Sequence, residues 1–387
     1  MKKVVTYVPI LFSLLFLLGC GEKEKKESKP ASPPPTTMQE QESSTELLVG
    51  TFTGEGSEGI YKLDFNTETG ELGNKTLLVV RENPGYLDIS RDRSRVYSSN
   101  SGTPGSLSIF EFNTDRSGLR HIGDYSSEGD GACFIELSKN ENLVAAANYG
   151  SGSIVLYSLD TKGMMVSGTA QKQQHKGSST SPRQKSAHAH CVKFDDTGKT
   201  LYAVDLGMDA VVAYPLGSDG RWGKGHTALK TRPGDGPRHM IFHPTKNMAF
   251  VINELSNTVI SAKVDAQKAK FEIIDQKSTL PDDFKDESFC ADIHLSPDNR
   301  FLYASNRGHN SIAIFSVSEE GQLEFLGTEP VRGDWPRNFT LSPDGRFLLA
   351  ANQKSGNITV FNVNRATGLL SYTGHELKMS QPVCLKF

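Results

Sequence analysis

The chain has 387 residues, with 45 acidic and 42 basic side chains and a formal net charge of −3. This balance provides no basic field for a nucleic acid, so we expect no nucleic-acid partner. The five cysteines form no Cys-x-x-Cys pair, which argues against a zinc ribbon or a thioredoxin-like site.

Residues 1–20 have the pattern of a targeting segment and are not expected to be part of the folded domain. Two lysines open the segment, and the apolar stretch 8–18 that follows is too short to span a bilayer comfortably. The sequence Leu-Leu-Gly-Cys ending at Cys20 resembles the lipobox of bacterial lipoproteins. We therefore expect cleavage before Cys20 and a lipid on its sulfur; an ordinary signal peptide with a chance cysteine is the alternative.

Residues 21–45 are rich in Pro, Glu, Lys and Ser and contain almost no apolar side chains. Such a composition cannot bury enough apolar surface to become ordered, so the segment is expected to be a disordered tether. Together with the lipidated cysteine, it predicts a lipid-anchored protein of the cell envelope, periplasmic or at the outer membrane.

A repeated phrase occupies the rest of the chain. Its clearest copies are residues 292–317 and 338–363, and fainter copies begin at residues 86, 134, 191 and 239, with a partial one at 47. Each copy predicts an alternating strand, a polar turn, a second strand ending in Asn or Asp, and a third strand. Four strands in roughly 40–50 residues are typical of a β-propeller blade. The sequence therefore predicts an all-β fold, a seven-bladed propeller formed by residues 46–387.

The two ends of this region complete one another. Residues 47–51 resemble a second strand without a first, whereas residues 382–387 resemble the first strand of the copy that starts at Pro237. We expect the C-terminal strand to close the first blade, which leaves no free sheet edge.

Reactive side chains occupy equivalent positions in consecutive repeats. One position precedes the innermost strand, and the other follows the second strand. Because these strands are antiparallel, both positions lie at the same end of the sheet. The residues expected around this mouth are His190, Arg238, Glu254, Arg307 and Arg337. Guanidiniums match carboxylate or phosphate, so the cluster favours an anionic small molecule. Blade-to-blade ion pairs are the alternative, but these would recur in every repeat.

Three further features leave alternatives open. His188 and His190 could bind a metal together, with His239 as a third ligand, but the nearby guanidiniums favour a metal-free site. A disulfide between Cys133 and Cys191 is conceivable, although buried packing is the favoured role of the cysteines. The polar insertion 171–186 is expected to form a loop over one face, either as a substrate cover or as a solvated surface.

The chain resembles the seven-bladed lactonase propellers, the family of bacterial 6-phosphogluconolactonase and fungal carboxy-cis,cis-muconate cyclase. The resemblance covers the whole predicted propeller. It is carried by the phrases VGTFTGEGSEGIY, ENPGYLDIS, AANYGSGSI, HAHCVKFD, LYAVDLGMDAV, PGDGPRHMIFHP, INELSNTV, SNRGHNSIAIF, WPRNFTLSPDGRFLLAANQ and PVCLKF.

The resemblance implies a lactonase that uses no cofactor and no metal. Its site residues fall on His190, Arg238, Glu254 and Arg307. His190 or Glu254 would be the general base, and the two arginines would stabilise the oxyanion. The residues predicted to bind the substrate are Arg337, His188, Trp335 and Gln353.

The expected envelope location of this chain differs from that of typical 6-phosphogluconolactonases, which are cytosolic. The resemblance therefore leaves open whether the substrate is phosphorylated. The expected partners are therefore a lactone, anionic but not necessarily phosphorylated, and the membrane through the lipid; we expect a monomer. Two alternative functions remain: a cyclase of the muconate type, and a non-catalytic envelope propeller that binds a protein or a glycan.

Overall fold

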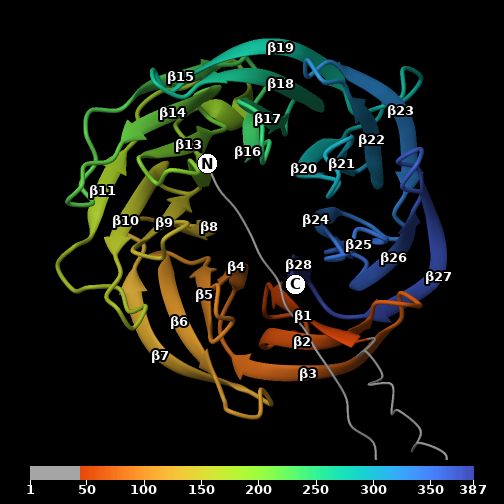
Figure 1. Ribbon diagram of the computed structural model, residues 1–387, viewed down its shortest axis with the longest axis horizontal. Helices are drawn as coiled ribbons and strands as arrows, with labels where there is room; N and C mark the ends of the chain where they lie inside the picture. The colour runs from red at the N-terminus through yellow and green to blue at the C-terminus, as the bar shows by residue number, and fades with distance from the viewer. Residues whose placement is uncertain (1–43) are drawn as a thin grey trace, which may run out of the picture. The chain divides into compact units, whose positions relative to one another are not determined.

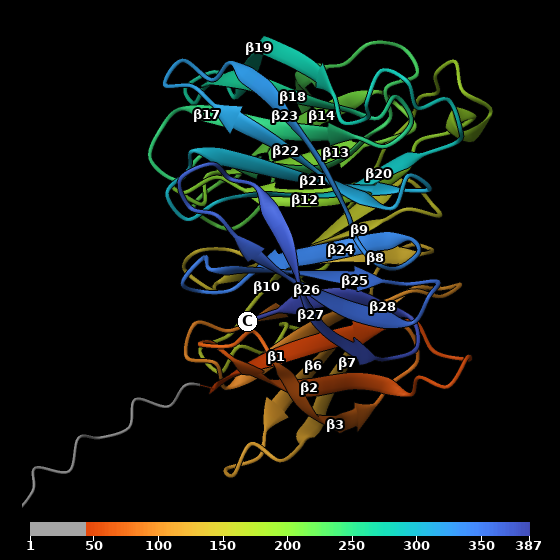
Figure 2. The same ribbon diagram turned by 90° about the vertical axis from the view of Figure 1, so that its right-hand side faces the viewer.

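Seven four-stranded antiparallel sheets surround a central axis in the computed structural model, which describes residues 44–387 (Figure 1). This arrangement confirms the predicted seven-bladed propeller. Figure 2 views the ring from one edge, where the sheets of successive blades lie one above another. The targeting segment, Cys20 and nearly all of the predicted tether lie outside the described residues.

The strands are given blade by blade, from the innermost strand outward. Blade 1 contains β28 (Pro382–Lys386), β1 (Ser44–Thr51), β2 (Gly59–Asn66) and β3 (Leu72–Val80). Blade 2 contains β4 (Pro84–Ile89), β5 (Arg95–Asn100), β6 (Ser106–Phe112) and β7 (Leu119–Ser126). Blade 3 contains β8 (Ala132–Leu137), β9 (Leu143–Asn148), β10 (Ser153–Ser158) and β11 (Gln171–Gln174). Blade 4 contains β12 (Ala189–Phe194), β13 (Thr200–Asp205), β14 (Ala210–Pro215) and β15 (His226–Lys230).

Blade 5 contains β16 (Pro237–Phe242), β17 (Met248–Asn253), β18 (Thr258–Asp265) and β19 (Lys270–Ser278). Blade 6 contains β20 (Phe289–Leu295), β21 (Phe301–Arg307), β22 (Ser311–Val317) and β23 (Leu323–Pro330). Blade 7 contains β24 (Pro336–Leu341), β25 (Phe347–Asn352), β26 (Asn357–Val363) and β27 (Leu370–Lys378). Within the described part of the chain, the one helical element is the 3-10 helix η1 (Pro182–Gln184).

The C-terminal strand completes blade 1, as predicted. In the antiparallel pair of β1 and β28, Val49 lies opposite Leu385 and Gly50 opposite Cys384. Strand β1 begins at Ser44, two residues before the predicted domain boundary. The closure joins the two ends of the propeller, so its innermost circle of strands is continuous.

The polar turn of each clear repeat is fixed by a left-handed residue. In the last repeat, Asp344 Oδ1 accepts hydrogen bonds from Ser342 Oγ at 2.6 Å and from the backbone N–H of Arg346 at 3.1 Å. Between them Gly345 has φ +69°, and Asn299 has φ +60° at the same place in the preceding repeat. Gly and Asn tolerate this backbone, which explains their recurrence in the turn.

In blades 3 and 6, the Asn that ends the second strand connects the blade to the preceding one. Asn148 Nδ2 donates to the carbonyl oxygen of Ser127 at 2.7 Å, and Asn306 Nδ2 donates to that of Thr279 at 3.0 Å. In both cases the carbonyl belongs to the residue that follows the outer strand of the preceding blade. The amide satisfies a buried carbonyl, which gives this sequence marker a physical reason. Asp205 occupies the same position in blade 4.

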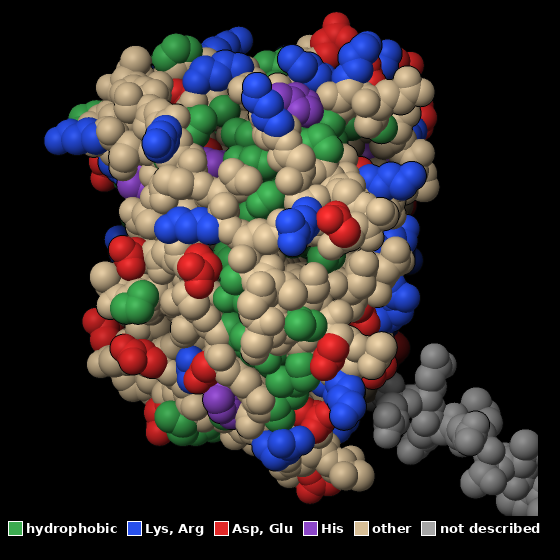
Figure 3. Space-filling view, turned by 90° about the vertical axis from the view of Figure 1, so that its left-hand side faces the viewer, with side chains coloured by type: hydrophobic (Ala, Val, Ile, Leu, Met, Phe, Trp, Pro, Cys, Tyr) green, Lys and Arg blue, Asp and Glu red, His purple; other side chains and the backbone are tan. Residues whose placement is uncertain are grey.

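Apolar side chains pack between neighbouring sheets, and all six residues of β9 and of β13 are buried. The side of the propeller shown in Figure 3 is mixed in charge, with Lys and Arg interspersed with Asp and Glu. Cys133, Cys191, Cys290 and Cys384 are free thiols. Among residues 44–387, no helix is long and apolar enough to cross a membrane.

Candidate active site

A cavity of about 250 Å³ lies where the innermost strands begin and the second strands end. The structure brings together there the five residues expected from the repeat, on blades 4 to 7. They are His190, Arg238, Glu254, Arg307 and Arg337. We call this space the mouth cavity.

A β-bulge recurs at the start of the innermost strands. The pairing register shifts between Ala189 and Cys191, and again on either side of Arg238 and of Arg337. The bulged residues are therefore His190, Arg238 and Arg337 themselves. A bulge re-aims a side chain without changing the rest of the ladder. The same backbone defect thus presents three different reactive groups from three blades.

Glu254 is the centre of the charged cluster. Its Oε2 lies 3.1 Å from Arg238 Nε and 3.0 Å from Arg307 Nη2, and its Oε1 lies 2.6 Å from Arg183 Nη1. Burial would raise the pKa of this carboxyl, but the charges of Arg307, Arg238 and Arg183 outweigh burial and lower the pKa to about 2. Glu254 is therefore ionised throughout the physiological range.

Backbone carbonyls hold two of these guanidiniums in place. Arg238 Nη1 donates to the carbonyl oxygen of Ala291 at 2.6 Å, and Arg307 Nη2 donates to that of Cys290 at 2.9 Å. The two arginines are 2% and 5% exposed. They form a fixed pair of donors against one wall of the mouth cavity.

Within the part of the chain that the structure describes, Arg337, unlike Arg238 and Arg307, has no carboxylate partner to balance its charge. Among residues 44–387 it makes no ion pair with a carboxylate, and its Cζ lies 5.1 Å from the centre of the Phe52 ring. Burial, and then the charges of Arg238 and Arg307, lower the pKa of Arg337 to about 9. A half-buried cation without an anion is costly, so this position suits an anionic ligand.

His190 is a buried, neutral imidazole. Its ring meets those of Tyr149 and His239 edge to face at 5.5 and 5.2 Å, and its Nδ1 lies 3.9 Å from Cys133 Sγ. Burial, followed by the charge of Arg238, lowers the pKa of His190 well below 6.5. The imidazole is thus free to accept a proton at neutral pH.

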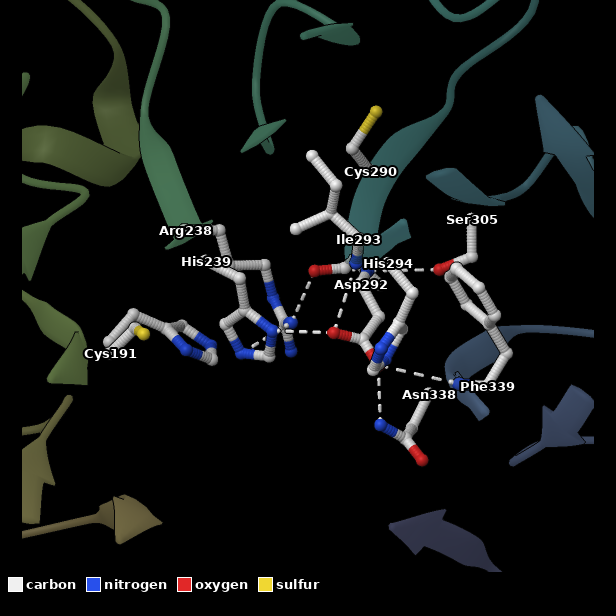
Figure 4. Close-up of polar contacts among 12 residues, drawn as sticks. Cys191, Arg238, His239, Cys290, Asp292, Ile293, His294, Ser305, Asn338 and Phe339 are labelled. Atoms are coloured by element: carbon white, nitrogen blue, oxygen red, sulfur yellow. Dashed lines mark hydrogen bonds and ion pairs between the residues drawn. The ribbon is translucent and has the colours of Figure 1, made fainter. Parts of the chain in front are cut away.

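A buried cluster behind Arg238 sets the protonation of His239 (Figure 4). Arg238 Nη1 donates to His239 Nε2 at 3.0 Å, which places the ring proton on Nδ1. That nitrogen lies 2.9 Å from Asp292 Oδ1, and Asp292 Oδ2 lies 3.1 Å from His294 Nε2. Asn338 Nδ2 donates to the same Asp292 oxygen. Asp292 thus connects blades 5, 6 and 7 beneath the mouth cavity.

Three predicted substrate-binding residues do not line the mouth cavity. The His188 ring stacks on Tyr149 at 4.5 Å, and its Nδ1 lies 2.8 Å from the Tyr149 carbonyl oxygen. The Trp335 ring lies 5.3 Å from Arg307 Cζ, and Gln353 Nε2 donates to Gln381 Oε1 at 2.9 Å. The position of His188 is explained by the β-bulge at His190. The bulge breaks the strand alternation that would place His188 and His190 on the same side.

The structure adds residues that sequence reasoning missed. Tyr149 lines the cavity from the position in blade 3 that Glu254 and Arg307 occupy in blades 5 and 6, so the repeat itself carried this signal. Arg183 comes from the predicted insertion 171–186, in the part that follows the fourth strand of blade 3. Part of that insertion, residues 171–174, is strand β11 rather than loop.

The alternative metal site has no geometric support. His188 is engaged by Tyr149, and His239 by Arg238 and Asp292. Across residues 44–387, no group of three or more His, Cys, Asp or Glu side chains is arranged to hold a metal ion.

Comparisons with known proteins agree with this fold. A 6-phosphogluconolactonase of Bacillus subtilis (strain 168) is 33% identical over 341 residues, covering 88% of this chain and 97% of that protein. A protein of Lactobacillus plantarum superposes with a TM-score of 0.83 and 29% identity, covering 89% of this chain and 99% of that one. The periplasmic gluconolactonase of Pseudomonas aeruginosa has a TM-score of 0.82 and 29% identity, covering 88% and 98%.

The family model for lactonases of the seven-bladed β-propeller type matches residues 46–387, which is the whole propeller. The match ends at the C-terminal strand that closes blade 1, so it includes every blade that contributes to the mouth cavity. This chain belongs to the seven-bladed β-propeller lactonase family.

Proposed function

We propose that the protein hydrolyses a lactone with an anionic substituent in the mouth cavity, without a metal. The observation that carries this proposal is the set of guanidiniums around Glu254. Arg238 and Arg307 are held rigidly by backbone carbonyls, and a fixed pair of donors suits an oxyanion that forms during the reaction.

His190 is the better of the two candidate bases. Glu254 is a weak base because three guanidiniums lower its pKa to about 2. His190 is neutral, and among the described residues no carboxylate pairs with it. Glu254 then serves to position Arg238 and Arg307, while His190 takes the proton from water.

The steps follow from this assignment. A water oxygen attacks the ring carbonyl carbon while His190 accepts the water proton. The carbonyl oxygen becomes an oxyanion, stabilised by Arg238 and Arg307. When the intermediate collapses, the bond from the carbonyl carbon to the ring oxygen breaks, and protonated His190 returns its proton to that oxygen. The product is a hydroxy acid, and the imidazole is neutral again.

Two relatives support different lactones. The name of the Bacillus relative specifies a phosphorylated lactone, whereas that of the Pseudomonas relative specifies a periplasmic enzyme and an unphosphorylated lactone. Arg337, which lacks a carboxylate partner among the described residues, would bind the anionic substituent that we propose.

A panel of lactones tests the proposal. Acid release would be followed for gluconolactone, 6-phosphogluconolactone and the lactone of a sugar dicarboxylic acid, after subtraction of the uncatalysed rate. We expect hydrolysis of at least one ring, and a loss of about 10²- to 10³-fold in kcat for Arg238→Ala. Arg238→Lys keeps the charge but loses the fork, so partial activity is expected. Wild-type protein that opens no lactone above background would refute the lactonase assignment for this panel and leave a binding propeller.

The pH dependence of the rate follows from His190. Because its pKa lies well below 6.5, the base stays neutral as the pH falls from 8 to 6. We therefore expect kcat/KM to remain level over this range and to decline only at more acidic pH. The check is kcat/KM between pH 4.5 and 8, corrected for spontaneous hydrolysis. A half-maximal point at pH 6.5 or above would exclude His190, in this environment, as the base.

We also propose that the protein is lipid-anchored in the cell envelope through Cys20. The support is the lipobox-like sequence of residues 1–20 and the periplasmic location named for the Pseudomonas relative. Cys20→Ser is expected to move the protein from the membrane fraction to the soluble one. Equal membrane recovery of both forms would contradict the anchor.

A further inference from the structure

Residues 175–187, between β11 and β12, form a segment that we call the strap. Its beginning is fixed by His175, whose Nδ1 lies 2.6 Å from Asp205 Oδ2. Its end is fixed by Gln184, whose Nε2 donates to Asp209 Oδ1 and to the carbonyl oxygen of Leu206, each at 2.7 Å. Gln184, Asp205 and Asp209 are fully buried. The strap backbone is therefore held on blade 4.

The first residue of the strap occupies the position that follows the outer strand of a blade. In blade 2, the residue at this position, Ser127, is hydrogen-bonded to the next blade. Asp205 stands where blades 2, 3, 5, 6 and 7 carry the marker Asn, and His175 follows β11 as Ser127 follows β7. At the far end, η1 is closed by a capping box between Ser181 and Gln184. These contacts place Arg183, inside η1, over the mouth cavity.

Arg183 differs from the other arginines of the cavity in how it is held. Its side chain is 41% exposed, and its polar partners are Glu254 Oε1 at 2.6 Å and the Tyr149 hydroxyl at 3.0 Å. It also lies 5.3 Å from the centre of the Phe289 ring. No backbone carbonyl is among these contacts, in contrast to Arg238 and Arg307. A long side chain on a fixed backbone can exchange partners without moving the strap.

We propose that Arg183 is a specificity-determining residue that leaves Glu254 and joins Arg337 in binding the anionic substituent of the lactone, a carboxylate or a phosphate. Glu254 tolerates the exchange because its other oxygen stays paired with Arg238 and Arg307. The guanidinium fork matches both anions, and a partly exposed position suits a group at the open end of the substrate. This inference rests on the proposed lactonase function and assigns the strap its role in it.

Binding of three probes tests this role without relying on turnover. Gluconate, glucarate and 6-phosphogluconate share one carbon chain and differ at the far end, which carries a hydroxyl, a carboxylate or a phosphate. Titration calorimetry would use the purified full-length protein and its Arg183→Gln variant. Lys185→Gln is the matched control, since Lys185 is an exposed neighbour outside the mouth cavity.

We expect Arg183→Gln to weaken binding of 6-phosphogluconate, glucarate or both by about 10-fold or more, and that of gluconate by less than about 2-fold. The probe that loses affinity identifies the anion. Lys185→Gln should bind all three as the wild type does. An equal loss for all three probes would reduce Arg183 to a support for Glu254 and overturn the inference. Unchanged binding of glucarate and 6-phosphogluconate, or no binding of any probe to the wild type, would also overturn it. Failure of the lactonase proposal shows separately, as a lack of ring opening by the wild type.

Discussion

Glu254→Gln is expected to inactivate the protein and to destabilise it by about 3–5 kcal/mol, because the change leaves buried guanidiniums without a counter-charge. Arg238 and Arg307 are both almost fully buried and share the same carboxylate oxygen. Glutamine fills the same volume, so packing is unchanged and the loss reflects charge. The measurement is the apparent melting temperature, with the lactone-opening rate measured beside it.

The loss of stability caused by Glu254→Gln should be largest near neutral pH and should become smaller as the pH falls. The carboxyl titrates near 4.5 when unfolded and near 2 when folded, so its contribution is fully present above pH 4.5 and is lost as the pH falls toward 2. Glu136→Gln is the control. Glu136 has one basic partner, Lys193 at 2.6 Å, and burial raises the pKa of its carboxyl. If both variants cost the same stability at pH 7, the counter-charge role of Glu254 is wrong.

Arg337→Met should have the opposite effect on stability. It removes a guanidinium that burial and its charged neighbours disfavour, so we expect a gain of about 0.5–2 kcal/mol and a higher melting temperature. At the same time, KM for an anionic lactone should rise by about 10- to 100-fold, because a charge-assisted hydrogen bond to the substrate is lost. This combination is typical of a residue kept for binding rather than for folding.

The control for Arg337→Met lies in the same blade. Arg346 is 40% exposed and pairs with Glu68 and Asp344, so Arg346→Met should leave KM unchanged and should not stabilise the protein. A fall in melting temperature for Arg337→Met, without any change in KM, would show that Arg337 is a structural residue.

The repeat predicts most of this fold because its turns and strand ends are determined by residues close together in the sequence. The turn around Gly345 fixes its hairpin, and the Asn that ends the second strand of blades 3 and 6 satisfies a carbonyl of the preceding blade. Position within the repeat also brings His190, Arg238 and Glu254 to one cavity. These features depend on residues close in sequence or on the symmetry of the blades.

The rest of the site depends on departures from the repeat. The bulge at His190 turns His188 away from its expected side, and strand alternation alone cannot reveal it. Arg183 lies in the predicted insertion, after the fourth strand of blade 3, so comparing positions at the inner strands could not place it beside Glu254. His239 and Asp292 are the first residues of two successive copies, but their contact depends on side-chain orientations that the repeat does not reveal.

The most direct test of the central claim compares the rates of lactone opening by the wild type and by His190→Asn at pH 7. If the mouth cavity performs the hydrolysis with His190 as its base, the variant loses about 10²-fold or more in kcat while its melting temperature stays close to that of the wild type. A His190→Asn protein that opens the lactone at the wild-type rate would contradict this account of the site.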